Sequence, residues 1–169
     1  MRSVNFEFLR AGSLQIGHEL ADLGSFAERY VFVDPESSLV KQRKFVELVV
    51  DLIYQQFDIK RLYQSSLRDL LDNEMFIKYV PPSVCHMFNT IRLAGNAGAH
   101  NNRTVPSARL ALDRLAQTYD VARYVICFAK AIQPASSRTL RQRLLRRGPK
   151  RQNPTLRHWK SCASPKPSI

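Results

Sequence analysis

The chain has 169 residues, 44% of them hydrophobic, which suffices for one domain with a buried core and is short for two. Its formal net charge is +12, yet ten of the 26 basic residues and none of the 14 acidic residues lie between Ala135 and Ile169. Residues 1 to 134 therefore carry a net charge of only +2, which excludes a strongly basic folded part as the source of the high isoelectric point.

The cysteines and the apolar runs exclude further classes. Cys85, Cys127 and Cys162 are widely spaced and form no CxxC pair, so we expect neither a disulfide framework nor a cysteine zinc site. The first ten residues include Glu7 and no long apolar run, which argues against a secretory signal. No stretch approaches the roughly 20 apolar residues of a membrane-spanning helix. We expect a soluble, cytoplasmic protein with no metal, no cofactor and no membrane partner.

Two helices are expected in the first third of the chain. The first runs from about residue 18 to residue 33, and its apolar face consists of Leu23, Phe26, Ala27 and Tyr30. Asp34 and Pro35 then predict a break and a new helix, because Asp is a favoured N-cap and Pro is tolerated at the first helical position. The second helix extends to about Phe57. Its apolar stripe consists of Leu39, Val46, Val49, Val50, Ile53 and Phe57, and its charged side of Lys41, Arg43, Lys44 and Glu47.

Three further helices are expected, which makes the predicted fold an all-α bundle of about five helices. A short one spans about residues 62 to 72 and carries Leu67, Leu70 and Leu71. The next begins at Pro81-Pro82, and its inward positions are Val84, Met87, Phe88, Ile91 and Ala94. The last spans about residues 106 to 132. It has a heptad-like seam of Ala108, Leu112, Leu115, Tyr119, Ala122, Ile126 and Ala129.

The composition changes abruptly at Gln133, where acidic residues disappear and Ser, Arg, Pro and Lys dominate. We expect a helical bundle domain over residues 1–133 and a disordered basic tail over 134–169. Three interpretations of the tail stay open: a nucleic-acid contact, an inert extension, or a non-native end translated out of frame after truncation, which we favour. The candidate nucleic-acid contacts in the tail are Arg141, Arg143, Arg146, Arg147, Lys150 and Arg151.

The candidate site is the run from Ile91 to His100. In a continuous helix, Arg92, Asn96 and His100 are four residues apart and share one face. Gly95 and Gly98 each cost about 1 kcal/mol relative to Ala within a helix, so we expect a neighbouring helix or a ligand to approach closely there. The three polar residues are candidates for phosphate binding and acid–base chemistry. We favour a structural role, in which Asn96 and His100 cap the helix end or tie it to the following loop, and Arg92 pairs with a carboxylate on a neighbouring helix.

The same run resembles a known family. Ile91-Arg-x-x-Gly-Asn-x-x-Ala-His100, followed by a helix like that from Ser107 to Tyr124, is similar to the N-terminal helical domain of type I restriction enzyme R subunits. The openings are similar too, in the runs Asn5-Phe-Glu-Phe-Leu9, Leu23-Gly-Ser-Phe-Ala-Glu-Arg-Tyr30 and Asp34-Pro-Glu-Ser-Ser-Leu-Val-Lys41, with Arg43 and Phe45. The resemblance covers about Ser3 to Ile132, and that domain is itself similar to the HEPN superfamily of helical bundles.

The resemblance implies an accessory module of a restriction enzyme, with DNA, RNA or restriction-modification subunits as partners and with no nuclease or ATPase core of its own. The alternative is a metal-independent RNase of HEPN type that uses Arg92 and His100, acting as a homodimer. Active HEPN RNases have four to six residues between Arg and His, and a polar residue after the Arg. Here seven residues separate Arg92 from His100 and Leu93 follows the Arg, so we expect no cleavage by this chain.

Overall fold

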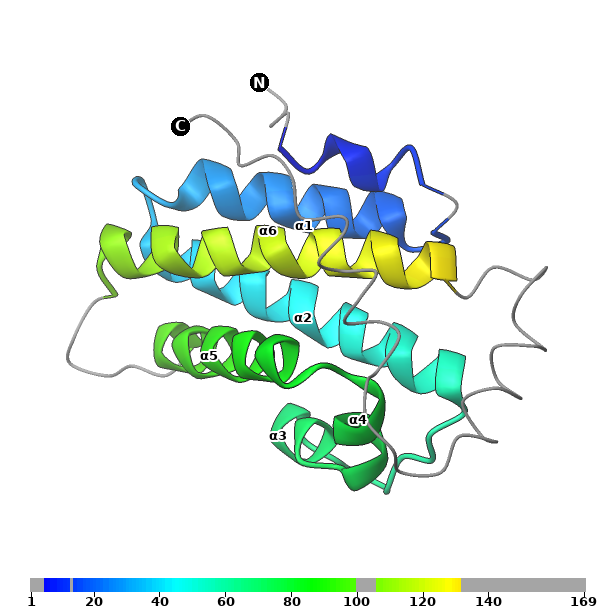
Figure 1. Cartoon of the computed structure of the whole chain (residues 1–169). Coiled ribbons are helices and arrows are strands. Elements are labelled where there is room, and N and C mark those ends of the chain that lie inside the picture. Colours follow the sequence, from blue (N-terminus) through cyan, green and yellow to red (C-terminus); the bar gives the residue numbers. More distant parts are fainter. Residues whose placement is uncertain (1–4, 13, 100–105, 132–169) are drawn as a thin grey trace.

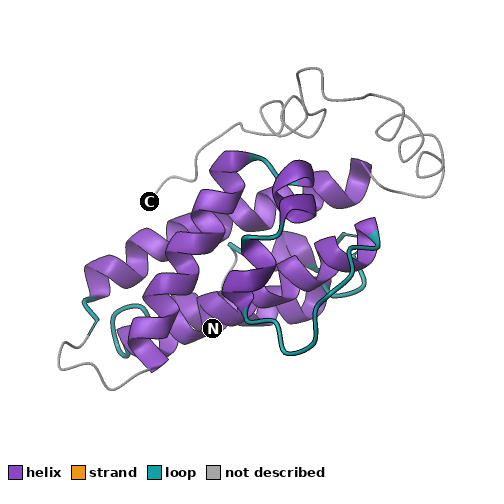
Figure 2. Cartoon of the chain, turned by 90° about the horizontal axis from the view of Figure 1, so that it is seen from below, coloured by secondary structure: helices purple, strands orange, loops and turns teal. Residues whose placement is uncertain are grey.

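The chain forms an all-α bundle, as expected. The structure is a computed structural model that describes residues 5–12, 14–99 and 106–131, and no strand occurs among them. A 3-10 turn and six α-helices follow one another (Figure 1): η1 (Glu7–Leu9), α1 (Gly17–Tyr30), α2 (Pro35–Phe57), α3 (Leu67–Leu71), α4 (Glu74–Tyr79), α5 (Pro82–Ala99) and α6 (Ala108–Ala131). The view from below in Figure 2 shows the helices packed into one body. The tail predicted over 134–169 lies outside the described residues.

The central element is α2, around which α1, α5 and α6 pack (Figure 1). Its bounds agree with the prediction: the Asp34 carboxylate accepts a hydrogen bond from the backbone N–H of Ser37 at 3.0 Å, and Pro35 opens the first turn. The predicted stripe is buried except for half-buried Phe57. Burying that stripe on three partners makes α2 the centre of the hydrophobic core.

Hydrogen bonds from buried and half-buried side chains fix α6 on its neighbours. Gln42 of α2 donates from Nε2 to the carbonyl oxygen of Ala111 in α6 at 3.1 Å. The hydroxyl of Thr90 in α5 donates to Oε1 of Gln117 in α6 at 2.8 Å. Since α6 bonds to both α2 and α5, it covers one side of that helix pair.

The buried face of α1 differs from the predicted one. Ala27 is buried as expected, but Phe26 is exposed, and Arg29 and Lys41 lie over its ring. Together with Ala27, the residues that enter the core are Leu20, Ala21 and Gly24, followed by Val31. The prediction was wrong by about one position because the ring of Phe6 packs on Gly24, and a glycine carries no apolar signal.

The seam predicted for α6 is also wrong in part. Leu115 and Ala122 are buried, whereas Leu112 is 39% exposed. The buried positions form a wider face made of Ala111, Leu115, Thr118, Val121, Ala122, Tyr124, Val125, Cys127 and Phe128. A heptad seam suits one partner helix, but α6 packs against α1, α2 and α5 and therefore buries more than a narrow stripe.

Between α2 and α5 the structure has two short helices where the prediction had one. Leu62, expected in a helix, is 80% exposed, and α3 begins only after Ser66. Ser66 and Asp69 form a reciprocal capping box, and Asn73 caps α4. Within the described residues, no helix is both long enough and apolar enough to cross a membrane.

Candidate functional site

The centre of the candidate site is the point where α5 crosses α2. A Cβ atom added to Gly95 of α5 would lie 2.5 Å from the Cβ of Arg43 and 3.1 Å from the carbonyl oxygen of Leu39, both in α2. Carbon atoms that are not bonded pack at about 3.5–4.0 Å, so a methyl group does not fit there without movement. The predicted close approach is confirmed for Gly95, and the approaching element is a helix.

Arg92 lies one turn before Gly95 and is half-buried. Its Nε and Nη2 atoms donate to Oδ1 of Asn89, at 3.1 and 2.7 Å. The predicted pairing with a carboxylate on a neighbouring helix is therefore wrong, since the partner is a neutral amide on the same helix. A neutral partner fixes the guanidinium but leaves its positive charge uncompensated.

Asn96 follows Gly95 directly and is half-buried. It comes four residues after Arg92 within the unbroken helix α5, so the two side chains share one face, as predicted. Its amide has no hydrogen-bond partner among the described residues. His100 lies outside the described residues, so the predicted face is observed for Arg92 and Asn96.

Arg43 is a residue of this site that the sequence pattern missed. The pattern places it on the charged side of α2, away from other helices, but its Cβ and Cδ atoms lie against Gly95. Its Nε atom lies 3.0 Å from Oε1 of Glu47, one turn further along α2. The spacing of four residues between Arg43 and Glu47 was visible in the sequence and predicts such a pair. The contact of this pair with α5, however, depends on the tertiary structure and cannot be read from the spacing.

The crossing of α2 and α5 lies within a part of the chain that is similar to a known protein family. Residues 25–145 match the model of a domain of unknown function, DUF4145. The chain belongs to the DUF4145 family. No curated protein and no solved structure matches the chain. The matched range of this DUF4145 chain begins within α1 and includes α2 to α6, so the crossing at Gly95, with Arg92 and Asn96 beside it, falls inside the family match.

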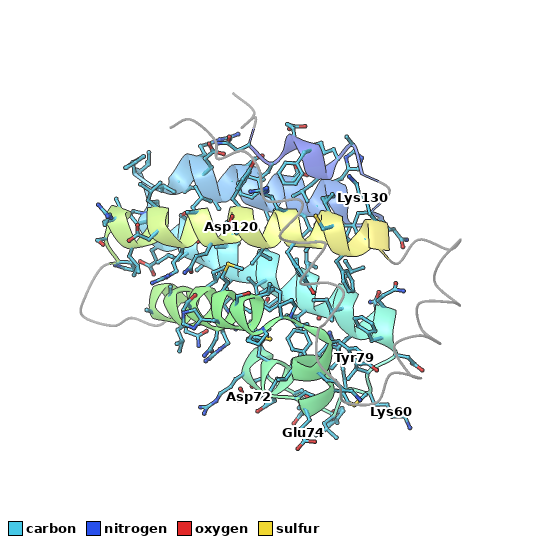
Figure 3. All side chains as sticks on the ribbon, in the orientation of Figure 1. Lys60, Asp72, Glu74, Tyr79, Asp120 and Lys130 are labelled. Carbon is cyan, nitrogen blue, oxygen red and sulfur yellow. The ribbon has the colours of Figure 1, made fainter. Side chains whose placement is uncertain are left out.

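The other predicted contacts of the DUF4145 chain are not among the described residues. They are Arg141, Arg143, Arg146, Arg147, Lys150 and Arg151. Figure 3 shows Asp72 and Glu74 at the end of the bundle formed by α3 and α4, and Asp120 on α6. Over the described ranges, no group of three His, Cys, Asp or Glu side chains is arranged to hold a metal ion. The candidate site at the α2–α5 crossing consists of the guanidinium groups of Arg43 and Arg92 and the amide group of Asn96.

Proposed function

We propose that this chain is an accessory helical module of a type I restriction endonuclease R subunit. In this role it contributes to assembly of a DNA restriction complex or to its nucleic-acid contacts. The support is the resemblance of several runs of the sequence to such subunits, together with the way these runs pack.

The resembling runs meet in the bundle. Gly24, in the run from Leu23 to Tyr30, has the ring of Phe6 against it, and a Cβ atom there would lie 2.4 Å from the ring. Gly95, in the run from Ile91 to His100, has Arg43 against it. Both glycines allow elements far apart in the sequence to touch, so the resembling residues include those that give the bundle its shape.

The single observation that carries the proposal is the state of Arg92. Its guanidinium is held by Asn89 and is not neutralised by an ion pair within the described residues. Such a group binds a phosphate without first breaking a salt bridge. It is therefore suited to contact with a nucleic-acid backbone.

The test uses the purified full-length chain and the modification and specificity subunits of a type I system from the same genome. We expect a stoichiometric complex by analytical ultracentrifugation and no cleavage of single-stranded RNA. A chain that sediments alone at micromolar concentration of all subunits would contradict the proposal.

A second candidate is the HEPN-type RNase, with Arg92 as the phosphate-binding group and His100 as acid or base. It is favoured by the two hydrogen bonds that hold Arg92 in one orientation, because a catalytic group needs such fixed geometry. RNA cleavage by the wild type that disappears in His100→Ala would establish it. A folded wild-type chain that leaves RNA intact would exclude it.

A further inference from the structure

Two arginines stand beside the crossing of α2 and α5, and each has a partner near its Nε atom. Arg43 forms an ion pair with Glu47, and Arg92 donates from Nε and Nη2 to Asn89. Among the described residues, the Arg43 guanidinium makes no hydrogen bond beyond this ion pair, and Nη1 of Arg92 has no hydrogen-bond partner. Each side chain is thus fixed near its base and keeps donors for another acceptor.

Both arginines are turned away from α6 on the α2–α5 pair. Gln42 and Thr90 mark the side that α6 covers, through their hydrogen bonds to Ala111 and Gln117. At about 100° of rotation per residue, Arg43 is turned about 100° away from Gln42, and Arg92 about 200° away from Thr90. We call the surface formed by Arg43, Glu47, Asn89 and Arg92 the outer α2–α5 edge.

The two arginines also lie near the same point of the crossing. Arg43 packs its Cβ and Cδ atoms against Gly95, and Arg92 comes three residues before Gly95 in α5. The Gly95 crossing therefore brings an arginine from a second helix to within about one helical turn of Arg92.

We propose that the outer α2–α5 edge is a binding site for the phosphodiester backbone of a nucleic acid, with Arg43 and Arg92 as its two phosphate-binding groups. The inference rests on the proposed function, whose nucleic-acid contact it places on named residues. Guanidinium groups match phosphate oxygens with paired donors, and such contacts set the position of a protein on a nucleic acid without reading its sequence. Glu47 orients Arg43 and at the same time reduces the positive charge of the edge.

Replacing Glu47 tests the proposal through the direction in which the binding affinity changes. In Glu47→Gln, the negative charge beside Arg43 is lost, while the side chain keeps its size and an oxygen near Nε of Arg43. Binding should become several-fold tighter, because the charge of the edge rises by one. A variant that only disturbed the fold would weaken binding instead.

The experiment measures affinity of the full-length chain for a 16-base-pair DNA duplex, and for a 16-nucleotide RNA, over a series of salt concentrations. Arg43→Met keeps the aliphatic stem against Gly95, and Arg92→Gln keeps a polar side chain beside Asn89. Each should weaken binding about five- to tenfold and lower the slope of log K against log salt by about 0.7–0.9. Basic residues of the tail contribute equally to all variants, so the differences report the edge alone.

The matched control is Arg109→Gln, which removes an exposed arginine paired with Asp113 on α6 and should change neither quantity. If the two edge variants behave like this control, or if the wild type binds neither probe, the inference fails. Subunit assembly still decides the proposed function in that case. Tighter binding of the duplex or of the RNA tells which nucleic acid supplies the phosphates.

Discussion

Gln42 in α2 donates a hydrogen bond from its side-chain amide to the carbonyl oxygen of Ala111 in α6, and both residues are fully buried. The same nitrogen donates to the Ser38 hydroxyl at 3.0 Å, and Oε1 accepts from the Thr118 hydroxyl at 3.4 Å. Ser38 in turn donates to the carbonyl oxygen of Ala27 in α1 at 2.7 Å. This chain of hydrogen bonds connects α1, α2 and α6, and fixes how they are placed along one another.

Replacing Gln42 with Met should destabilise the bundle by about 2 kcal/mol. The substitution roughly preserves volume but leaves the Ala111 carbonyl and the Thr118 hydroxyl without this partner in the core. Urea unfolding followed by circular dichroism measures the change. Gln55→Met, on the exposed surface of the same helix, should stay within about 0.5 kcal/mol of wild type. Equal values for the two variants would contradict a structural role for the buried amide.

Gly95→Ala should lower the free energy of unfolding by about 1–3 kcal/mol. On an exposed helix the same change stabilises by about 1 kcal/mol, so the sign of the effect reports the crossing. The new methyl group would lie 2.5 Å from the Cβ of Arg43, and α5 and α2 must move apart to admit it. Thermal and urea unfolding both give the sign. Leu93→Ala, at an exposed position of α5, serves as the control with little change expected.

The cap at Asp34 predicts a pH dependence of stability. Hydrogen bonding to Ser37, through its side chain and then its backbone N–H, lowers the pKa of the Asp34 carboxyl below its ordinary value of 3.8. The contribution is present in full above that value and is lost as the pH falls through the lower folded-state pKa.

The measurement for this cap compares wild type with Asp34→Asn, which keeps an acceptor oxygen but does not titrate. Wild type should be the more stable of the two near pH 6, and the difference should shrink as the pH approaches about 2. A difference that is constant over this range would show that the charge of Asp34 plays no part.

Burial should make the thiol of Cys85 react slowly with alkylating reagents. Removal from solvent raises the pKa of its thiol to about 11 from an ordinary 9.0, which leaves about a hundredfold less thiolate at pH 8. In a chain with Cys127→Ser and Cys162→Ser, alkylation by iodoacetamide should be correspondingly slow and should accelerate up to about pH 11. The same chain unfolded in urea gives the reference rate. Native and unfolded chains that react equally fast at pH 8 would refute the burial of this thiol.

The sequence by itself determined the elements whose signals are local. The Asp34-Pro35 start of α2, its apolar stripe and the start of α5 at Pro82 were all predicted, because a cap and a period of 3.6 residues act within a few turns of one helix. Gly95 was correctly predicted as a point of close approach, since a glycine within a helix costs stability unless a neighbour needs the space. The all-α class followed from these local signals.

Only the tertiary structure decided which faces are buried and which side chains meet. Phe26 and Leu112 fit their predicted stripes but are exposed, because the number and direction of the partner helices set the width of a buried face. Arg43 lies on the polar side of α2 by pattern and yet packs on α5, and Arg92 found Asn89 instead of a carboxylate. A periodic sequence specifies that a helix has an apolar side, whereas the identity of its neighbours depends on contacts between residues far apart in the chain.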